Sequence, residues 1–278
     1  KLIEHFLANR AARLRARKHR PTKPLAVMAP LPSAEALCVL DDAARAALAH
    51  PSAPILLLPL AADAPLAAGV APGQSHLGLM LPYAPLHHLL LEDVGRPLVM
   101  TSGNRSSEPQ AFRDVDARES LAGIADAFLM HDRPIARRLD DSVARLAAGH
   151  LRVMRRGRGL APMPLTLPED FEGAPAILAL GGELKSAFCL TARRNALLSH
   201  HLGDLDEPAT GEEFEAAHRD YTAIFRHRPA AVAVDLHPNY RASRHGADIA
   251  RDAGLPLFSI AHHHAHITAT LAEAGWRR

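Results

Sequence analysis

Cysteine is scarce in this sequence, since only Cys38 and Cys189 occur among 278 residues and no C-x-x-C spacing is present. A disulfide framework is therefore excluded, and a reducing cytoplasm is the expected location. No apolar run approaches the roughly 20 residues of a membrane-spanning helix, so we expect no membrane partner. Aromatic residues make up only 4% of the chain, which argues against an RNA-binding module built on base stacking.

Hydrophobic residues make up 48% of the chain and charged residues 22%, as in folded proteins with a sizeable core. A length of 278 residues predicts two domains. The net charge is only +2, but positive charge is concentrated. Residues 1–20 hold seven Lys and Arg against the single acid Glu4, and residues 131–160 hold eight Arg against three Asp. Two basic clusters in a nearly neutral chain indicate bound anions.

The first half of the chain alternates apolar strands with helical patterns. An amphipathic helix is expected from Leu2 to Leu14, running into a basic segment, and a buried strand from Leu25 to Met28. Further strands are expected at 55–58, 77–81, 97–100 and 151–154, and helices at 34–49, 84–92 and 117–124. This alternation predicts an α/β sheet.

Lys18, Arg20 and Lys23 lie on a short turn stiffened by Pro21 and Pro24, between the first helix and the first strand. Three cations on a stiff turn can converge on one anion. The alternative is a solvated basic helix end that is favoured by the helix dipole, and the charges alone do not separate the two interpretations.

A second candidate anion site follows the strand that ends at Met100. Residues 101–109 supply hydroxyl and amide side chains with a glycine, which suits phosphate or ribose binding, although a plain turn has the same composition. Arginines at 137, 138, 155, 156 and 158, with glycines at 157 and 159, also look suited to phosphate.

Residues 18–24, 101–104, 131–143 and 155–159 together resemble the YrdC-like family, which uses ATP to activate a carbamate as a carbamoyl or threonylcarbamoyl adenylate. The resemblance implies a twisted mixed sheet with helices. It also implies an adenylate site, in which Lys23 joins the residues that match family motifs: Lys18, Arg20, Ser102, Asn104, Arg138, Ser142 and Arg156. Family members have a strand and a glycine-bearing turn before the basic helix, and we expect this part of the sheet to be missing or altered.

A Pro-rich segment with acidic residues, 162–172, marks the expected domain boundary. The segments after it are predicted in the order β-β-β-α-β-α-β-α. That order resembles the ribonuclease-H-like first half of the actin and Hsp70 ATPase superfold. In that fold the turn after the first strand, here Gly181 and Gly182, approaches nucleotide phosphates closely.

Four imidazoles follow the last predicted strand, at positions 262, 263, 264 and 266. His262 and His266 are four residues apart, so on a helix they share one face. A helix N-terminus disfavours the imidazolium and leaves ring nitrogens available to a metal, but an isolated H-x-x-x-H is a weak signal. Both a site role and a structural role stay open for five other residues: Lys185, His200, His201, Asp204 and His237.

Residues 179–190, 199–205, 234–240 and 262–266 resemble the carbamoyltransferase relatives of the universal tRNA threonylcarbamoyl transferase. In those relatives the H-x-x-x-H pair binds a metal, which implies zinc or iron on His262 and His266. A YrdC-like module followed by such a module is the order of the hydrogenase maturation carbamoyltransferases, the HypF family. We therefore expect a YrdC-like domain over residues 1–165 and the N-terminal half of a metal-binding carbamoyltransferase domain over 174–278.

The resemblance implies ATP-dependent carbamoyl transfer, with Mg²⁺-bound ATP and carbamoyl phosphate or carbamate as substrates. The implied acceptor is the C-terminal cysteine of a HypE-like maturation protein, and the carbamoyl group becomes the cyanide ligand of a nickel–iron hydrogenase. The alternatives are tRNA threonylcarbamoylation and a non-catalytic RNA-binding module. We expect a fragment truncated at both ends, without the family's acylphosphatase and zinc-finger modules. Because the carboxylate that completes the metal site lies on a later strand, we expect weak metal retention or none.

Overall fold

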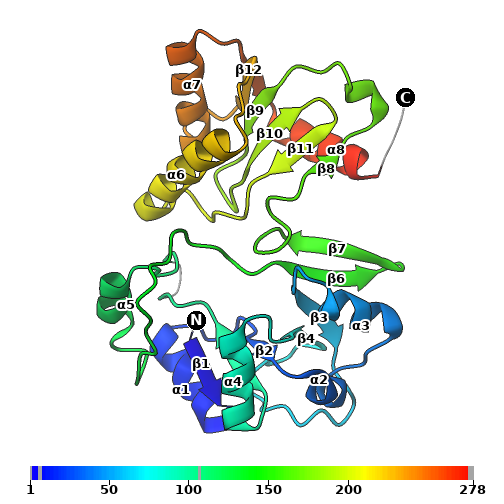
Figure 1. Ribbon diagram of the computed structural model, residues 1–278, viewed down its shortest axis with the longest axis vertical. Coiled ribbons are helices and arrows are strands. Elements are labelled where there is room, and N and C mark those ends of the chain that lie inside the picture. Colours follow the sequence, from blue (N-terminus) through cyan, green and yellow to red (C-terminus); the bar gives the residue numbers. More distant parts are fainter. Residues whose placement is uncertain (1, 6–7, 106–107, 275–278) are drawn as a thin grey trace. The chain divides into compact units, whose positions relative to one another are not determined.

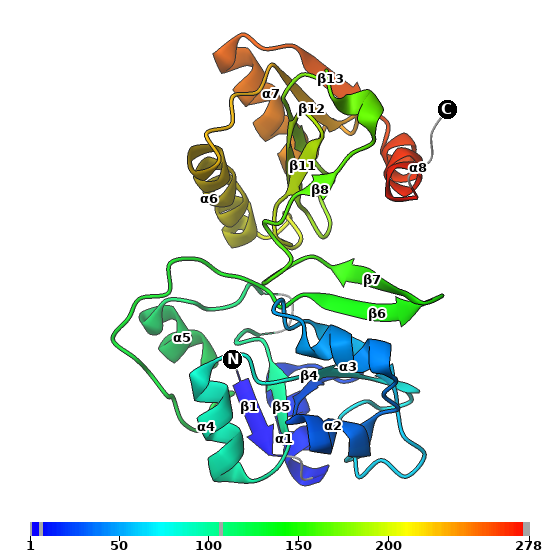
Figure 2. The ribbon, with the colours of Figure 1, turned by 45° about the vertical axis from the view of Figure 1, so that its right-hand side comes forward.

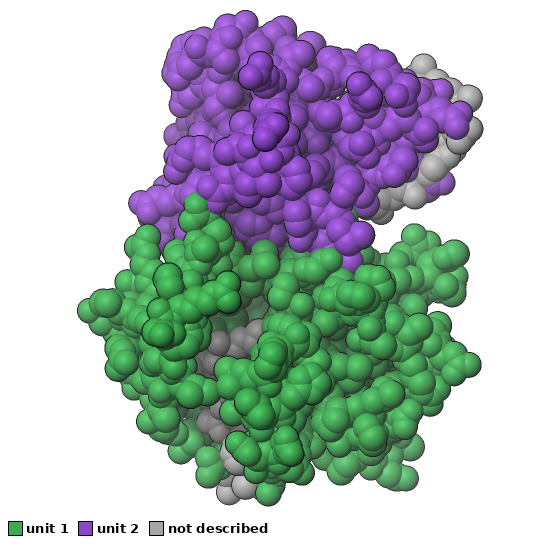
Figure 3. Space-filling view, in the orientation of Figure 1, with its two compact units in different colours: residues 1–159 green, residues 160–278 purple. Residues whose placement is uncertain are grey.

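A computed structural model describes residues 2–5, 8–105 and 108–274. The chain divides into two compact units, residues 1–159 and residues 160–278 (Figure 3). Each unit is built on its own mixed β-sheet with helices (Figures 1 and 2), which confirms the predicted α/β class. Within the described ranges, none of the helices combines the length and the hydropathy that crossing a membrane requires.

In the described part of the first unit the strands are ordered β1-β5-β2-β4-β3-β6-β7. They are β1 (Leu2–His5), β2 (Ala26–Met28), β3 (Ile55–Pro59), β4 (His76–Met80), β5 (Leu98–Thr101), β6 (Val143–Ala147) and β7 (His150–Arg155). The helices are α1 (Ala8–Lys18), α2 (Leu31–Leu37), α3 (Asp42–Ala49), α4 (Pro85–Val94) and α5 (Asp114–Leu121). β2 is parallel to β4 and antiparallel to β5, so the sheet is mixed.

Both faces of the central strands of this sheet are buried. On one face Val27 and Val99 belong to a core shared with α1, α2 and α3. On the other face Met28 and Met100 pack with Leu91 of α4. Successive side chains of a strand point to opposite faces, so a strand covered on both faces consists of continuous apolar residues. This explains the apolar runs in the sequence.

The structure corrects two predictions about the first helices. Leu2–His5 forms β1, which pairs antiparallel with β5, and the helix begins only at Ala8. A strand therefore precedes the basic helix, and residues 6 and 7 between the two lie outside the described residues. Short apolar segments do not distinguish a strand from a helix by periodicity, and here the neighbouring β5 decides between them.

The single helix expected over residues 34–49 is instead two helices. α2 ends before Cys38, which forms a bridge with Leu60, and Asp41 starts α3 by accepting a hydrogen bond from the Ala44 amide at 2.7 Å. An aspartate at this position satisfies an amide that has no partner inside the helix. The Ala-rich composition hides the break.

The second unit has the strand order β13-β12-β9-β10-β11-β8 in its described residues. The strands are β8 (Leu165–Thr166), β9 (Ile177–Leu180), β10 (Phe188–Ala192), β11 (Asn195–Leu198), β12 (Ala231–Asp235) and β13 (Leu257–Ile260). A short 3₁₀ helix η1 (Glu169–Phe171) precedes β9, and the α-helices are α6 (Pro208–Ile224), α7 (Arg241–Ala253) and α8 (His262–Glu273). The Pro-rich segment contributes β8, which pairs with β11.

One face of this second sheet packs against α6 and α7. Phe214 and Ala217 of α6 and Ala242 of α7 share a core with Phe188 and Val232 of the sheet. Figures 1 and 2 show α8 on the opposite side of the same sheet from α6 and α7. β12 is parallel to both β9 and β13, so the carboxyl ends of these three strands lie at one edge. The polar residues that follow these strands can therefore meet there.

We expect Asp41→Ala to lower the free energy of unfolding by about 1 kcal/mol, because the Ala44 amide loses its cap. Urea unfolding followed by circular dichroism measures the change. Asp42→Ala is the matched control, since Asp42 makes only an exposed ion pair with Arg45 and should cost less than about 0.5 kcal/mol. Equal losses in the two variants would contradict the role of Asp41 as the cap.

Candidate functional site

Lys18 is the last residue of α1, and its side chain is almost fully buried, at 1% exposed. Its Nζ donates to the carbonyl oxygens of Ser102 and Asn104, at 2.7 and 2.8 Å, and to Oδ1 of Asn104 at 3.0 Å. An ammonium group has three protons, so each has an acceptor. The structure thus brings together three residues singled out in the sequence, although Lys18 and Ser102 are 84 positions apart.

The loop after β5 is folded closely around this cation. Ser102 Oγ donates to Oδ1 of Asn104 at 2.6 Å, and Nδ2 of Asn104 donates to the carbonyl of Glu108 at 2.7 Å. Burial and, to a smaller extent, the charge of Arg20 together lower the pKa of Lys18 to about 8. Lys18 therefore remains protonated at neutral pH, beneath a half-buried loop of hydroxyl and amide groups.

Arg20 lies on the turn after Lys18. Its Nε donates to the carbonyl of Lys23 at 3.3 Å and its Nη2 to that of Pro24 at 2.6 Å. Burial lowers the pKa of Arg20, and the charges of Arg15 and Arg155 lower it further. Arg155 ends β7, so a charge from the second basic cluster acts on Arg20 as well. Lys23 is exposed. Cations from distant segments that face one region attract a polyphosphate.

The remaining predicted residues of the first unit are Ser142, just before β6, Arg156, just after β7, and Arg138 in the preceding loop. Ser142 is fully buried, and its hydroxyl accepts from the Gly157 amide at 2.9 Å and donates to the Arg158 carbonyl at 3.0 Å. Its hydroxyl thus joins two chain segments. Arg138 is buried at 9% exposed and Arg156 is half-buried.

Arg158 has a packing role in the arginine- and glycine-rich segment. Its guanidinium carbon lies 3.5 Å above the ring centre of Tyr83, and its Nε donates to Asp141 at 3.2 Å. Nη2 also donates to the carbonyl of Ala53 at 2.8 Å. These contacts hold the segment against the sheet. They give Arg158 a structural role, whereas the sequence pattern of arginines and glycines suggested phosphate binding.

The two glycines of this segment are needed for close backbone contact. A Cβ at Gly157 would lie 2.3 Å from the carbonyl oxygen of Asp140. Gly159 has φ +82°, and a Cβ there would lie 2.4 Å from the carbonyl oxygen of Ser52. Any larger residue would displace the backbone, so chain packing by itself accounts for both glycines.

In the second unit, His262 is the first residue of α8, and its Nδ1 lies 2.6 Å from Oδ2 of Asp235. Asp235 is the last residue of β12, and its side chain is 7% exposed against 54% for His262. β12 and β13 are parallel neighbours, so their ends place the two residues side by side. Asp235 was not singled out in the sequence, although an aspartate that ends a buried strand is a usable signal.

Nε2 of His262 and Nε2 of His266 are 3.2 Å apart, and the two rings meet edge to face. When Asp235 accepts from the Nδ1–H of His262, the proton is fixed on that nitrogen and the lone pair of Nε2 faces His266. The pair predicted from its spacing therefore does converge. Within the described ranges, no group of three His, Cys, Asp or Glu side chains is arranged to hold a metal.

Gly181 and Gly182 lie at the end of β9, next to this pair. The Gly181 amide donates to the carbonyl of Ala187 at 3.2 Å, and a Cβ at Gly181 would lie 2.6 Å from that oxygen. A Cβ at Gly182 would lie 3.2 Å from Cε1 of His262. Gly181 thus allows close contact with the Ala187 backbone, and Gly182 leaves room for the imidazole and borders the candidate site.

The other candidates of the second unit have identifiable neighbours. His237 stacks on Tyr240, with ring centres 4.2 Å apart, and Tyr240 in turn lies 6.5 Å from the ring of His262. The Lys185 amide donates to Oδ1 of Asp204 at 2.7 Å, so Asp204 holds the turn before β10. His200 is buried at 7% exposed against Tyr221, while His201 is half-buried.

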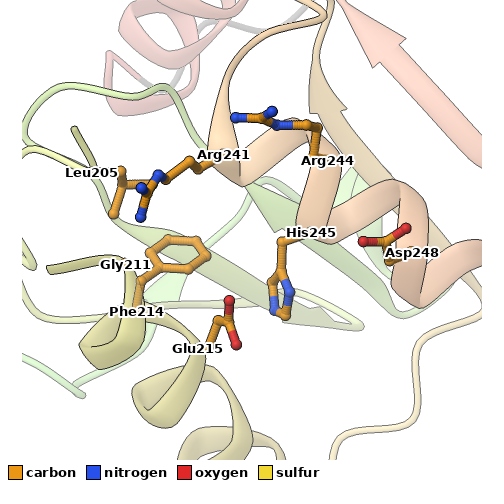
Figure 4. Close-up of a pocket in the computed structure, with 8 residues that line it drawn as sticks. All are labelled: Leu205, Gly211, Phe214, Glu215, Arg241, Arg244, His245 and Asp248. Atoms are coloured by element: carbon orange, nitrogen blue, oxygen red, sulfur yellow. The ribbon is translucent and has the colours of Figure 1, made fainter. Parts of the chain in front are cut away.

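A pocket of about 360 Å³ lies between α6 and α7 (Figure 4). Its lining combines apolar and charged side chains: Leu205, Gly211, Phe214, Glu215, Arg241, Arg244, His245 and Asp248. None of the residues predicted from the sequence lines it. His245 also belongs to a cluster of aromatic rings. The ring centre of His218 lies 5.5 Å from that of His245 and 5.7 Å from that of Phe188.

We expect the second unit to lose stability as the pH falls from about 6.5 towards 4. Burial and, to a smaller extent, the charges of His245 and Arg219 together lower the pKa of His218 to about 4. Between pH 6.5, the pKa of His218 in the unfolded chain, and pH 4, its pKa in the folded chain, only the unfolded chain binds a proton at this residue. Lowering the pH through this range therefore favours unfolding. Urea midpoints at pH 7 and pH 5 should differ less in His218→Phe than in the wild type. Exposed His263→Gln serves as the control, and an unchanged pH dependence in His218→Phe would contradict the assignment.

Two family matches divide the sequence as the structure does. Residues 5–157 match the Sua5, YciO and YrdC family, described as Telomere recombination. Residues 172–273 match the HypF Kae1-like domain.

Several relatives match almost the whole chain. Carbamoyltransferase HypF of Rhodobacter capsulatus is 55% identical over 263 residues, which is 95% of this chain and 35% of the relative. The Synechocystis HypF is 40% identical over 95% of this chain and 34% of its own length. A crystal structure of full-length HypF in the phosphate- and nucleotide-bound form has a TM-score of 0.89 and 39% identity, over 98% of this chain and 42% of that one. The chain spans about a third of the length of the curated relatives.

Proposed function

The chain belongs to the Sua5, YciO and YrdC family and carries that module ahead of a HypF Kae1-like domain, and we propose that it serves ATP-dependent carbamoyl transfer as a segment of a HypF carbamoyltransferase. In the first unit, a carbamate oxygen attacks the α-phosphorus of Mg²⁺-bound ATP. The bond from that phosphorus to the bridging oxygen breaks, and pyrophosphate leaves with the electron pair. Carbamoyl adenylate is the product, and carbamoyl phosphate is the source of the carbamate.

The observation that carries this proposal is the Lys18 cross-link to the loop of Ser102 and Asn104. It holds hydroxyl and amide groups next to a buried positive charge, while Arg20 and Arg155 add charge from the neighbouring turn and from β7. Such a set binds a triphosphate and offsets the negative charge that develops on the leaving pyrophosphate. Because the groups are fixed before the nucleotide binds, little reorganisation is needed.

The second unit transfers the carbamoyl group to a thiol. The thiol sulfur attacks the carbamoyl carbon, the carbon–oxygen bond to AMP breaks, and the thiol proton is released. We assign the acceptor as the C-terminal cysteine of a HypE-like maturation protein, with the cyanide ligand of a nickel–iron hydrogenase as the eventual product. Gly182 and the carboxyl edge of β9, β12 and β13 border the reaction site.

A divalent metal, zinc or iron, fits the histidine pair of the second unit. The fit rests on two converging Nε2 atoms 3.2 Å apart and on Asp235, which orients one of the rings. His262 and His266 would hold the metal, and when bound it polarises a carbonyl oxygen or orients the nucleotide. Asp235 meanwhile keeps the Nδ1 proton of His262 in place, so that Nε2 remains a ligand.

We expect the chain to incorporate labelled pyrophosphate into ATP when ammonium carbamate is supplied. Lys18→Met should reduce this exchange roughly 100-fold, because the variant loses both the charge and the cross-link that shapes the loop. Arg45→Ala is the matched control, since it removes one exposed positive charge on α3.

The same exchange assay, run in parallel with other substrates, distinguishes carbamoyl adenylation from the two alternative functions. Carbamoyl phosphate alone reports whether the chain can also generate carbamate. Exchange that requires threonine and bicarbonate would replace the proposal with tRNA threonylcarbamoyl-adenylate synthesis. Binding of tRNA without any exchange would instead favour an RNA-binding module.

We expect the chain to bind Zn²⁺ through His262 and His266 only weakly, because these two nitrogens form half of a coordination shell. Titration monitored by imidazole NMR signals should show binding that His266→Ala abolishes and that Asp235→Asn weakens about tenfold or more. His264→Ala, on the same helix and exposed, should leave the binding unchanged. Near-stoichiometric metal in the purified chain would contradict the half-site.

A further inference from the structure

Arg15 is a buried cation of the first unit that the proposed chemistry does not use. Ala11, Leu14, Arg15 and Lys18 are all less than 10% exposed, so they form one buried stripe along α1. Their spacing is that of a helix face packed on a core, yet two of the four carry a positive charge. Long basic side chains are rarely buried unless they are paired, so Arg15 must have acceptors inside the protein.

Those acceptors are all backbone carbonyl oxygens. The guanidinium of Arg15 donates to Gly69 (2.6 Å), Arg20 (2.9 Å), Lys23 (3.0 Å), Val70 (3.2 Å) and Pro21 (3.3 Å). Three of these oxygens belong to the basic turn of residues 20–24, and two belong to the segment before β4. Arg15 therefore fastens the turn to a second part of the fold.

This arrangement controls which groups the turn can present. The carbonyls of Arg20, Pro21 and Lys23 accept from Arg15, while the Arg20 guanidinium lies along its own turn and Lys23 is exposed. A planar guanidinium offers five donors in fixed directions and can bridge two chain segments. A lysine ammonium has only three donors at a single point and cannot form the same set.

We propose that Arg15 is a positioning residue for the nucleotide site: it holds the turn that presents Arg20 and Lys23 to the phosphates of ATP, without contacting the nucleotide itself. This inference rests on the proposed adenylation function. Backbone bonds at both ends of the turn agree with it, because the Arg20 amide donates to the Arg15 carbonyl at 2.9 Å and the Leu25 amide to that of Val70 at 3.0 Å. The turn is thus tied down at its start, along its length and at its end.

Arg15→Lys tests the inference because it keeps the positive charge and removes the planar fork. We expect the Arg20 and Leu25 amides to exchange hydrogen at least tenfold faster, while the Val27 and Val99 amides of the core keep wild-type rates. KM for ATP in pyrophosphate exchange should rise about tenfold, with a smaller change in kcat, because in the variant the turn must become ordered when ATP binds. Millimolar guanidinium should partly restore KM in Arg15→Ala.

Arg17→Lys is the matched control. Arg17 lies on the same helix and donates to the Ile124 carbonyl and to Asp126, away from the basic turn, so its variant should retain wild-type values. Wild-type hydrogen exchange at Arg20 and Leu25 in Arg15→Lys would overturn the inference, as would an unchanged KM for ATP. A wild-type chain without pyrophosphate exchange would contradict the proposed function alone, and hydrogen exchange would still decide whether Arg15 holds the turn.

Discussion

The first unit depends on the burial of a positive charge, the ammonium of Lys18. Removing an ammonium from water costs several kcal/mol unless oxygen atoms replace the lost hydration. The three replacing oxygens all come from Ser102 and Asn104, so the end of α1 and the loop after β5 stabilise each other. Neither segment can move away without leaving a buried charge or buried carbonyls unsatisfied. A rigid cationic site is the consequence, and it is suited to binding a polyphosphate.

Arg15 extends the same principle by one helical turn. Both cations lie on the buried stripe of α1, and the hydrogen bonds of both are accepted by carbonyl oxygens rather than by carboxylates. The distinction matters for an anion site, since a carboxylate partner would cancel the positive field, whereas carbonyl oxygens satisfy the hydrogen bonds and leave the net charge in place. In the second unit the situation is reversed, because there a buried carboxylate, Asp235, orients His262. That pairing suits a site whose ligand is a cation.

The misplaced predictions share a physical origin. The break between α2 and α3 was missed because alanine favours helix throughout residues 34–49, while the cap at Asp41 and the bridge at Cys38 depend on neighbours distant in sequence. β1 was taken for helix because the strand that pairs with it, β5, is about 95 residues further on. The glycines at 157 and 159 fit a phosphate site in the sequence, and the fold gives a second reason for them, which is close contact with the backbones of Asp140 and Ser52. A local pattern does not reveal which distant segment will lie against it.

Composition and periodicity by themselves determined the α/β class, the order of elements from β9 to α8, the concentration of positive charge and the i, i+4 histidine pair, because these properties reside in contiguous residues. The tertiary structure decided which of the charged residues act together. Only the mixed sheet order places the loop of Ser102 over Lys18, and only the parallel pairing of β12 with β13 places Asp235 against His262. Arg15 and Asp235 went unnoticed for this reason: each matters through partners that the chain brings close only when it folds.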